Sequence, residues 1–495
     1  MVTSVMTAAV PPARLRTALE QAGLLIEVRG TLPPIIVDLT DDSRRTGTGI
    51  CFVAVRGSAR DGHAYLPEVE RDGAAMVIIA ADATTALPAL VVKDTRAAAA
   101  VAAAAFYGEP AKGMQIVGVT GTNGKTTTVS LLRHLLDSPE TPSASIGTLG
   151  VLRGNGIPFG GGSGLTTPGP IELQRVLRAL AKAGVKRVAM EVSSHALDQQ
   201  RVGGVAFAAA VFTNLTRDHL DYHGTMDAYF EAKARLVSLL APDGTAVVNA
   251  DDPWWSRLAA APRTVRFGTV QPADVRAADV RYTPRGSAWL LQWGEASRPV
   301  VLPLIGDFNV MNALAAAATA LALGMTVEQV AAKLATAPQV PGRLELLSDR
   351  PTILRDYAHT PDALARALEA LRPFTPGRLI VVFGCGGDRD RGKRPLMAEA
   401  ARAGADHLVV TSDNPRTEDP ERILDDICAP LAAGTFDRIE DRRAAIAHAV
   451  RLADPQRDVV LLAGKGHETY QIRGTTSHPF DEAEIVKELL LGHGR

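Results

Sequence analysis

The segment that most constrains the fold is GVTGTNGKTTT, residues 118–128, which lies between an apolar run and a helical stretch. The run that leads into it, QIVGV, predicts a buried strand, and the residues after it predict a helix that ends near Leu136. A glycine-rich turn between such a strand and helix directs backbone N–H groups and the helix N-terminus at an anion. The segment therefore predicts a phosphate-binding loop on a mostly parallel sheet.

Several residues of this loop have distinct expected roles in binding a nucleotide. Gly121 and Gly124 let the backbone approach the phosphates. Lys125 can reach the terminal phosphates, and the Thr126 hydroxyl can ligate magnesium. The strict pattern would begin with a glycine where Val119 stands, and a turn that binds no ligand is the alternative interpretation of the bare motif. The predicted nucleotide-binding residues here are Gly121, Thr122, Asn123, Gly124, Lys125, Thr126 and Thr127.

Composition narrows the classes of protein that the chain can belong to. With 46% hydrophobic and 22% charged residues it is typical of folded, soluble proteins. Lysine and arginine total 53 against 54 acidic residues, so the formal net charge is -1. Because no overall field attracts a polyanion, nucleic acid is not an expected partner.

Cysteine usage and apolar runs indicate the compartment. Cys51, Cys385 and Cys428 are far apart and lack the spacing of a metal site or a disulfide framework, which favours a reducing cytoplasm. Residues 1–20 lack the pattern of an export signal. The longest apolar stretch, Ala313 to Leu323, is about half a membrane span, so we predict a cytoplasmic protein without membrane insertion.

The order of predicted elements indicates three α/β domains, as expected for 495 residues at roughly 150 per domain. Residues 1–108 mix short β-rich runs with an alanine-rich helix, whose expected N-cap is Asp94 or Thr95, and predict a small α/β domain. Residues 109–342 alternate apolar strands and helices, which predicts a P-loop domain with a doubly wound, mostly parallel sheet. Residues 343–495 follow the expected linker PQVPGR and predict a Rossmann-like domain.

Three further positions in the central domain carry candidate chemistry. Glu191 ends an apolar run, so we expect it at the carboxyl edge of the sheet, where a second magnesium contact would suit it. Asp218 and His219 follow another strand, in NLTRDHLDYHG. For His223 an ordinary hydrogen-bonded surface histidine is an equal alternative, and Lys233 by itself reads as a solvated helical lysine.

Taken together, GTNGKTTT, EVSSHALDQQR, TNLTRDHLDYHG and EAKARL resemble the Mur ligase family of peptidoglycan synthesis. The similarity continues in order through DDSR, GDFNVMNALAA, VPGRLE, DYAHTPDAL, FGCGGDRDRGKRP, DNPR and AGKGHETYQ. It implies an ATP-dependent ligase that phosphorylates the D-glutamyl carboxylate of UDP-N-acetylmuramoyl-L-alanyl-D-glutamate. An amine then displaces phosphate from the acyl phosphate.

The resemblance also implies roles for single residues in ATP and Mg²⁺ binding. The expected catalytic residues are Lys125, Glu191, His219 and Lys233. The expected magnesium ligands are Thr126, Glu191, His219 and Lys233, with Lys233 carbamylated to N6-carboxylysine. Asn309 and Asn312 are expected near the base, and Arg343 and Asp356 near the ribose and phosphates, from across the linker. Helix capping is the alternative interpretation of Asn309 and Asn312.

For the UDP-muramoyl dipeptide, the resemblance places one group of residues at the uridine end and another along the sugar and peptide. They are Asp41, Ser43, Ser58, Ala59, Arg60, Thr166, Thr167, Ser193, Gln199 and Arg201. Asp41 and Leu165 differ from the residues that some relatives carry there. Simple turn chemistry is the alternative for Ser43 and Thr166 taken alone.

DNPR, Asp413 to Arg416, follows an apolar run and is the signature of the diaminopimelate-adding members that the chain resembles. A guanidinium can bind the distal carboxylate of meso-diaminopimelate through two hydrogen bonds, whereas it would repel the ammonium end of lysine. A surface ion pair of Arg416 with a nearby acid such as Glu418 is the alternative. The predicted diaminopimelate residues are Arg389, Asp413, Asn414, Pro415, Arg416, Gly464 and Glu468.

Other functions remain open at this point. A lysine-adding ligase of the same family would ignore Arg416, and a P-loop phosphotransferase would share Lys125, Thr126 and Glu191. A nucleotide-gated binding or scaffold protein is a third class. The expected partners are small molecules, namely ATP, the UDP-muramoyl dipeptide and meso-diaminopimelate, and we expect a monomer.

Overall fold

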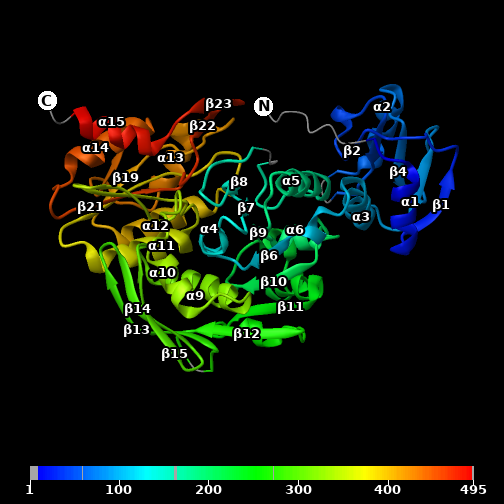
Figure 1. The fold of residues 1–495 in the computed structure, drawn as a ribbon. Helices are drawn as coiled ribbons and strands as arrows, with labels where there is room; N and C mark the ends of the chain where they lie inside the picture. The colour runs from blue at the N-terminus through cyan, green and yellow to red at the C-terminus, as the bar shows by residue number, and fades with distance from the viewer. Residues whose placement is uncertain (1–8, 58–59, 161–163, 271, 493–495) are drawn as a thin grey trace. The chain divides into compact units, whose positions relative to one another are not determined.

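The computed structural model describes residues 9–57, 60–160, 164–270 and 272–492 (Figure 1). It has three α/β regions, each built on its own sheet, which is the fold class predicted from the sequence. Spatial proximity divides the chain into two units. The first holds the described part of Met1–Ala277 with Leu291–Arg298 and Met311–Lys333. The second holds Ala278–Leu290, Pro299–Val310 and the described part of Leu334–Arg495. The domain borders near residues 108 and 342 stay predictions.

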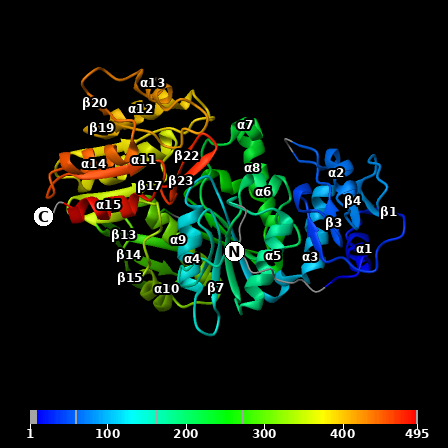
Figure 2. The ribbon, with the colours of Figure 1, turned by 90° about the horizontal axis from the view of Figure 1, so that it is seen from above.

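The first region is a five-stranded sheet in the order β1-β5-β4-β3-β2. Alternate residues of its strands face opposite sides, so α1 and α3 cover one face and α2 covers the other (Figure 2). Asp94, one of the two expected N-caps, caps α3 by accepting hydrogen bonds from the N–H groups of Arg96 and Ala97. The bounds are α1 Pro12–Gln21, β1 Leu25–Arg29, β2 Asp38–Thr40, β3 Ile50–Val53, α2 Leu66–Arg71, β4 Met76–Ala80, β5 Ala89–Val92 and α3 Thr95–Tyr107.

The second region is a ten-stranded sheet in the order β15-β14-β13-β12-β11-β10-β6-β9-β7-β8. Its strands are β6 Gln115–Thr120, β7 Ser143–Gly147, β8 Gly150–Arg153, β9 Arg187–Glu191, β10 Phe207–Phe212, β11 Leu240–Asn249, β12 Arg263–Gly268, β13 Val275–Thr283, β14 Gly286–Trp293 and β15 Ala296–Leu302. The accompanying helices are α4 Lys125–Leu136, α5 Pro170–Lys182, α6 Ser194–Asp198, α7 Leu220–His223, α8 Met226–Ala234, α9 Asp307–Ala322 and α10 Val327–Leu334.

The strand pairing of this sheet brings the predicted loops together. β6 pairs in parallel with β10 on one side and with β9 on the other. Val119 is level with Glu191 and Thr120 with Phe212, so the three strands end at the same edge. Helices α4 and α5 cover opposite faces (Figure 2).

The third region is a six-stranded sheet in the order β16-β17-β21-β18-β19-β20, with a separate β22–β23 hairpin. Helices α11, α12 and α13 cover one face, and α14 and α15 cover the other. Figure 1 shows α11 and α12 on the opposite side of the sheet from α14 and α15. The strands are β16 Glu345–Asp349, β17 Thr352–Asp356, β18 Leu379–Phe383, β19 His407–Val410, β20 Phe436–Arg438, β21 Val459–Ala463, β22 Tyr470–Arg473 and β23 Thr476–Pro479. The helices are α11 Pro361–Leu371, α12 Lys393–Gly404, α13 Pro420–Cys428, α14 Arg442–Leu452 and α15 Glu482–Gly492.

Across the residues that the structure describes, no helix combines the length and the apolar character that crossing a membrane requires.

Candidate active site

The predicted phosphate-binding loop connects β6 to α4, with the strand ending at Thr120 and the helix beginning at Lys125. Gly121 has φ +146° and Gly124 has φ +84°, backbone conformations that residues with a Cβ atom rarely adopt. A Cβ atom on Gly121 would overlap the Thr213 hydroxyl, and one on Gly124 would overlap the Asn312 side chain. The two glycines are therefore required by both conformation and space.

The loop is fastened to the segment that follows β10. Asn123 N–H donates to Asn214 Oδ1 at 3.0 Å, and Thr122 Oγ1 donates to Thr216 O at 3.1 Å. Lys125 Nζ folds back over the loop and donates to the carbonyls of Gly121, at 2.9 Å, and Thr122, at 2.8 Å. Thr126 and Thr127 are buried in the first turn of α4. The ammonium group thus lies over the loop, where a phosphate would need a cation.

Glu191 is the last residue of β9 and is only 1% exposed. Its Oε1 accepts a hydrogen bond from Thr148 N–H at 2.8 Å, and its Oε2 accepts one from Thr148 Oγ1 at 3.2 Å. A Cβ atom on Gly147 would overlap the Glu191 carboxylate, so a glycine is needed where β7 passes it. The buried carboxylate is a hard oxygen donor of the kind that magnesium prefers.

Three histidines lie close together beside the edge of the second sheet at which β6, β9 and β10 end. His219 lies with its Nε2 3.5 Å from Asp218 Oδ2, and its ring centroid is 4.9 Å from that of His195. His223 Nε2 lies 3.0 Å from Ser194 Oγ, so His223 is hydrogen-bonded and partly buried. Burial lowers the pKa of His219 and His223, and burial with the neighbouring histidines lowers the pKa of His195 to about 4. All three imidazoles are therefore neutral near pH 7 and can act as ligands.

Lys233 lies on α8 and is 1% exposed, so its interpretation as a solvated lysine is wrong. Its Nζ donates to Gly121 O at 2.7 Å and lies 4.5 Å from the centroid of the Tyr229 ring. Burial, followed by the nearby charge of Lys125, holds the pKa of Lys233 well below its ordinary value. The sheet thus brings a buried, readily neutralised amine directly under the phosphate-binding loop.

Four of the residues expected along the sugar and peptide form one hydrogen-bonded network. Thr167 Oγ1 donates to Glu191 O at 2.9 Å and accepts from Ser193 N–H at 3.1 Å. Arg201 donates to Thr167 O at 3.1 Å and to Gln199 Oε1 at 2.7 Å. These side chains therefore lie on the first unit immediately next to Glu191.

The remaining residues expected to hold this substrate are not members of that network. Thr166 Oγ1 lies 3.2 Å from Thr148 Oγ1, and Asp41 Oδ2 lies 3.9 Å from the position of a Cβ atom on Gly169. Burial raises the pKa of Asp41. Ser43 begins a short 3-10 turn, and Arg60 is exposed. Ser58 and Ala59 lie outside the described residues.

Arg175 joins α5 of the second region to β2 and α3 of the first region within this unit. It donates to the Tyr107 hydroxyl at 2.9 Å and pairs with Asp38 at 3.2 Å. It also donates to Leu39 O at 3.3 Å, close to Asp41 in the chain. This contact fixes the segment that carries Asp41 and Ser43 against the central sheet.

Two of the residues expected near the ribose and phosphates lie together in the second unit. The Arg343 guanidinium carbon lies 4.9 Å from the centroid of the Tyr357 ring, and Asp356 Oδ2 accepts from Leu344 N–H at 2.7 Å. Burial raises the pKa of Asp356. Asn309 and Asn312 are the third and sixth residues of α9, so their interpretation as helix caps is wrong. Asn309 Nδ2 donates to Ile305 O at 2.7 Å.

Arg416 is held over the loop that follows β18. Its NH1 donates to Gly387 O at 2.8 Å, and its N–H donates to Ile472 O at 3.0 Å. A Cβ atom on Gly386 would lie 2.9 Å from Arg416 NH1 and 3.7 Å from Arg389 Cγ. The structure therefore brings the two predicted cations of the amino-acid site to the same glycine.

Glu418 does not neutralise Arg416. It pairs with buried Arg394 at 2.9 Å and with Arg391 at 3.1 Å. The alternative interpretation of Arg416 as the partner of Glu418 is therefore wrong.

The other residues predicted to hold diaminopimelate meet around a buried lysine. Lys465 is 0% exposed, and its Nζ donates to Asn414 Oδ1 at 3.2 Å and to Glu468 Oε2 at 3.3 Å. Asn414 Nδ2 donates to the same Glu468 oxygen at 2.8 Å. A Cβ atom on Gly464 would lie 2.7 Å from Asp413 Oδ2, and one on Gly387 would overlap Pro415 O. Loops that follow β18, β19 and β21 thus converge.

The sequence matches the Mur ligase middle domain over residues 119–320 and the Mur ligase glutamate ligase domain over residues 342–466. A curated relative from Gloeobacter violaceus, named UDP-N-acetylmuramoyl-L-alanyl-D-glutamate--2,6-diaminopimelate ligase, is 46% identical over 489 residues, or 97% of this chain and 98% of the relative. The chain belongs to the Mur ligase family. The middle-domain match of this Mur ligase includes Glu191, His219 and Lys233.

Solved structures agree with the family assignment of this Mur ligase. A structure of UDP-N-acetylmuramoyl-L-alanyl-D-glutamate--2,6-diaminopimelate ligase is 34% identical, with a TM-score of 0.70, and covers 99% of this chain and 100% of that chain. The MurF ligase from Thermotoga maritima in complex with ADP is 20% identical, with a TM-score of 0.59, and covers 91% of this chain and 96% of that chain. At 20% identity, the similarity to the MurF ligase shows a shared fold only.

Several residues that contact the predicted site of this Mur ligase were not predicted from its sequence. They are Thr148, Arg175, His195, Tyr229 and Lys465. Lys465 stands between two glycines in AGKGHE, and His195 stands in EVSSHALDQQR, so motif membership could have identified both. Thr148 and Arg175 have no comparable sequence signal, because their partners come from other strands and helices.

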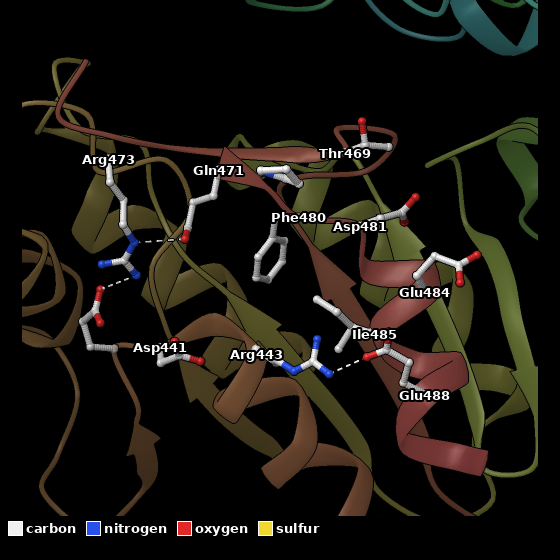
Figure 3. A pocket seen from close by; sticks show the side chains of 12 residues that line it. Asp441, Arg443, Thr469, Gln471, Arg473, Phe480, Asp481, Glu484, Ile485 and Glu488 are labelled. Atoms are coloured by element: carbon white, nitrogen blue, oxygen red, sulfur yellow. Dashed lines mark hydrogen bonds and ion pairs between the residues drawn. The ribbon is translucent and has the colours of Figure 1, made fainter. Parts of the chain in front are cut away.

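A pocket of about 500 Å³ in the second unit lies between the β22–β23 hairpin and helices α14 and α15 (Figure 3). It borders the amino-acid residues, because Gln471, which lines it, donates to Asp413 O at 2.8 Å. None of the side chains that line it is a predicted site residue of this Mur ligase. Arg473 pairs with Glu440 at 2.9 Å, and Arg443 pairs with Glu488. Because both arginines are paired with carboxylates, this pocket does not have the character of an anion site.

Proposed function

We propose that this Mur ligase uses ATP to join meso-diaminopimelate to the D-glutamyl carboxylate of UDP-N-acetylmuramoyl-L-alanyl-D-glutamate. The observation that carries the proposal is the convergence of Arg416 and Arg389 at Gly386, beside the Asn414, Lys465 and Glu468 group. The curated relative at 46% identity, which carries the corresponding name, supports it.

In the first step, a carboxylate oxygen of the D-glutamyl residue attacks the γ-phosphorus of ATP, and the bond to ADP breaks. The loop of residues 121–127 would hold the phosphates through its N–H groups, with Lys125 compensating their charge. Thr167, Ser193, Gln199 and Arg201 would orient the peptide carboxylate next to Glu191. Asp41, Ser43, Ser58, Ala59, Arg60 and Thr166 would hold the UDP-sugar.

The donor set at this edge fits Mg²⁺, because hard oxygen atoms dominate it. Thr126 and Glu191 would hold one ion, and His219 with carbamylated Lys233 a second. A bound Mg²⁺ offsets the charge of the transferring phosphate. Carbamylation joins the neutral amine nitrogen of Lys233 to carbon dioxide with loss of a proton, and the low pKa of this buried amine favours it.

In the second step, the amine nitrogen of the incoming amino acid attacks the acyl carbon, and phosphate leaves. Arg416 and Arg389 would bind the distal carboxylate of meso-diaminopimelate. Oxygen atoms of Glu468 and Asn414 would accept hydrogen bonds from its distal ammonium group. The ammonium end of L-lysine would instead meet two guanidinium groups. Asp413, Pro415 and Gly464 shape the same loops.

The remaining assignments concern the nucleotide and the domains. Asn309 and Asn312 would lie near the base of ATP, and Arg343 and Asp356 near its ribose and phosphates. The N-terminal region, residues 1–108, would bind the UDP-sugar, residues 109–342 ATP, and residues 343–495 the amino acid. The reaction needs no membrane and no nucleic acid.

The test is phosphate release by the purified chain with ATP, Mg²⁺ and the UDP-muramoyl dipeptide, in the presence of meso-diaminopimelate, of L-lysine or of no amino acid. We expect release with meso-diaminopimelate alone, together with the mass of the tripeptide product. Equal release with L-lysine would leave the ligase and overturn its specificity. Release without any amine would favour a P-loop phosphotransferase instead.

A further inference from the structure

Three potential metal ligands meet at the edge of the third sheet, outside the candidate active site. His407 is the first residue of β19, Asp437 lies in the middle of β20, and His448 lies on α14. The Nε2 atoms of His407 and His448 lie 2.8 Å and 2.6 Å from the same oxygen, Oδ2 of Asp437. Ligand atoms of all three residues lie within 4.8 Å of one another.

The topology of the sheet explains why these residues meet. β19 and β20 are parallel, and Val409 is paired with Asp437, so both side chains point to the same face. His407 precedes Val409 by two residues and therefore shares that face. Helix α14 covers it, with Val409 packed in the same cluster as Ala445 and Ala449. His448 is the neighbour of Ala449 and reaches the edge strand.

The group is separate from the amino-acid site although both involve β19. His407 begins the strand, whereas DNPR follows its carboxyl end, and the four residues of β19 span about 13 Å. β20 is the last strand in the sheet order, so solvent reaches this edge. All three side chains are partly exposed, at 27% for His407, 38% for Asp437 and 34% for His448, which leaves room for an ion to enter.

Two imidazole nitrogens and one carboxylate oxygen form a donor set that suits Zn²⁺ better than Mg²⁺. In a tetrahedral zinc site with bonds of about 2.0–2.2 Å, ligand atoms are roughly 3.3 Å apart. The two nitrogens already converge on one carboxylate oxygen, so these two N–O separations would widen by about 0.5 and 0.7 Å to admit the ion. A water molecule would complete the fourth position.

We propose that His407, Asp437 and His448 bind Zn²⁺ and thereby tie the edge strand β20 to β19 and α14. Strand β20 has three residues and pairs with β19. A metal bound by three elements of the folded chain stabilises them in proportion to its concentration, since the unfolded chain does not hold the ligands together. A hydrogen-bonded group that binds no metal is the competing explanation of the same contacts.

The test uses the full chain without a polyhistidine tag, freed of metal by a chelator. Zn²⁺ binding is measured by calorimetry with Mg²⁺ and ADP in excess, so that the candidate active site is occupied, and Co²⁺ binding is followed by visible absorption. We expect one Zn²⁺ per chain, the intense absorption of four-coordinate Co²⁺, and a Zn²⁺-dependent rise in the thermal midpoint.

Matched variants separate the site from other histidines. His448→Gln and His407→Gln should each raise the Kd for Zn²⁺ at least 10-fold and remove the rise in thermal midpoint, as should Asp437→Asn. His478→Gln changes an exposed histidine on β23 and should bind like the natural chain. Unchanged affinity in His448→Gln and His407→Gln, loss of binding in His219→Gln instead, or the absence of any stoichiometric Zn²⁺ binding would overturn the proposal.

Discussion

Two regions of this Mur ligase are expected to hold anions, and they are built in opposite ways. The phosphate-binding loop is one unbroken segment between β6 and α4, and its anion-binding groups are backbone N–H groups. The amino-acid region takes its side chains from three loops, which follow β18, β19 and β21. A contiguous loop sets its own conformation through glycines such as Gly121 and Gly124, whereas a composite site depends on the order of the strands.

The contrast has a physical consequence for how each region responds to substitution. Amide groups cannot be removed by changing side chains, so the loop is vulnerable at its glycines and at the cations around it. The amino-acid region depends on arginine and lysine side chains and on the buried contacts that hold their loops. Substitutions in the amino-acid region should therefore change the affinity for the amino acid and leave the affinities for the other substrates unchanged.

The largest effect is expected for Lys233→Ala, which tests whether the phosphate-binding loop functions without a residue that is distant in the sequence. Lys233 lies 112 residues from Gly121, yet it donates to the Gly121 carbonyl. If its carbamate compensates phosphate charge, kcat for tripeptide synthesis should fall by roughly 1,000-fold, equivalent to about 4 kcal/mol. Phosphate release at saturating substrates measures this, and formate or acetate should restore part of the rate.

The matched control for that substitution is Lys112→Ala, since Lys112 is an exposed lysine paired with Glu109 on the surface. Its kcat should stay within about twofold of the natural chain. Normal turnover in Lys233→Ala would mean that the phosphate-binding loop acts without this distant residue.

The next largest effect is expected for Arg442→Met, which removes a buried ion pair that supports the loops of the amino-acid region. Arg442 and Glu482 are fully buried and paired at 2.8 Å, and Arg442 also donates to Ala463 O at 2.9 Å, where β21 ends. Removing the guanidinium leaves a buried carboxylate without its partner, which should lower the free energy of unfolding by about 3 kcal/mol. Urea unfolding followed by circular dichroism measures the change.

Its neighbour Arg443 provides the comparison, because Arg443 pairs with Glu488 at the surface. Arg443→Met should cost less than about 1 kcal/mol. The double substitution Arg442→Met with Glu482→Met should recover most of the stability, since no buried charge is then left alone. An equal loss in both single variants would contradict the importance of the buried pair.

A smaller but more selective effect is expected for Arg416→Ala. Loss of two charge-assisted hydrogen bonds to the distal carboxylate should raise the KM for meso-diaminopimelate by roughly 100-fold. The KM for ATP should change less than about twofold. Arg416→Lys should rescue little, because an ammonium cannot make the planar paired contact.

Arg391→Ala is the control for that experiment, since Arg391 lies in the same loop region but is exposed and paired with Glu418. Equal changes in the KM for ATP and for diaminopimelate in Arg416→Ala would show that the two regions are not energetically separate. The contrast between the phosphate-binding loop and the amino-acid region would then not hold.

The smallest effect is a pH dependence of stability from His195. Its folded pKa of about 4 lies below the usual value near 6.5, so the unfolded chain takes up a proton first as the pH falls. This contribution to stability is present above about pH 6.5 and is lost toward pH 4. Allowing for partial exposure, we expect a loss of about 1 kcal/mol between pH 6.5 and 4.5.

Urea unfolding of the natural chain and of His195→Gln at these pH values measures the difference. The variant should show the shallower decline in stability, while His478→Gln, at an exposed position on β23, should follow the natural chain. Parallel declines in all three proteins would exclude a role for His195 in this pH range.

Sequence patterns were sufficient where the relevant interactions are local. The strand before the loop, the helix from Lys125 to Leu136 and the capping of α3 by Asp94 agree with prediction, because neighbouring residues decide them. The family motifs also named residues that the structure brings together, such as Thr167 with Ser193 and Asn414 with Glu468. The roles proposed for these residues stay predictions.

The sequence by itself determined the fold class, the family and the order of the motifs, since apolar periodicity and glycine spacing are properties of short segments. Only the tertiary structure decided that Lys233 is buried, that Glu418 pairs with Arg394 and that Lys465 joins Asn414 to Glu468. It likewise decided that His407 and His448 share one carboxylate oxygen. Burial and charge pairing depend on which strands become neighbours, and strand order is not written in any single segment.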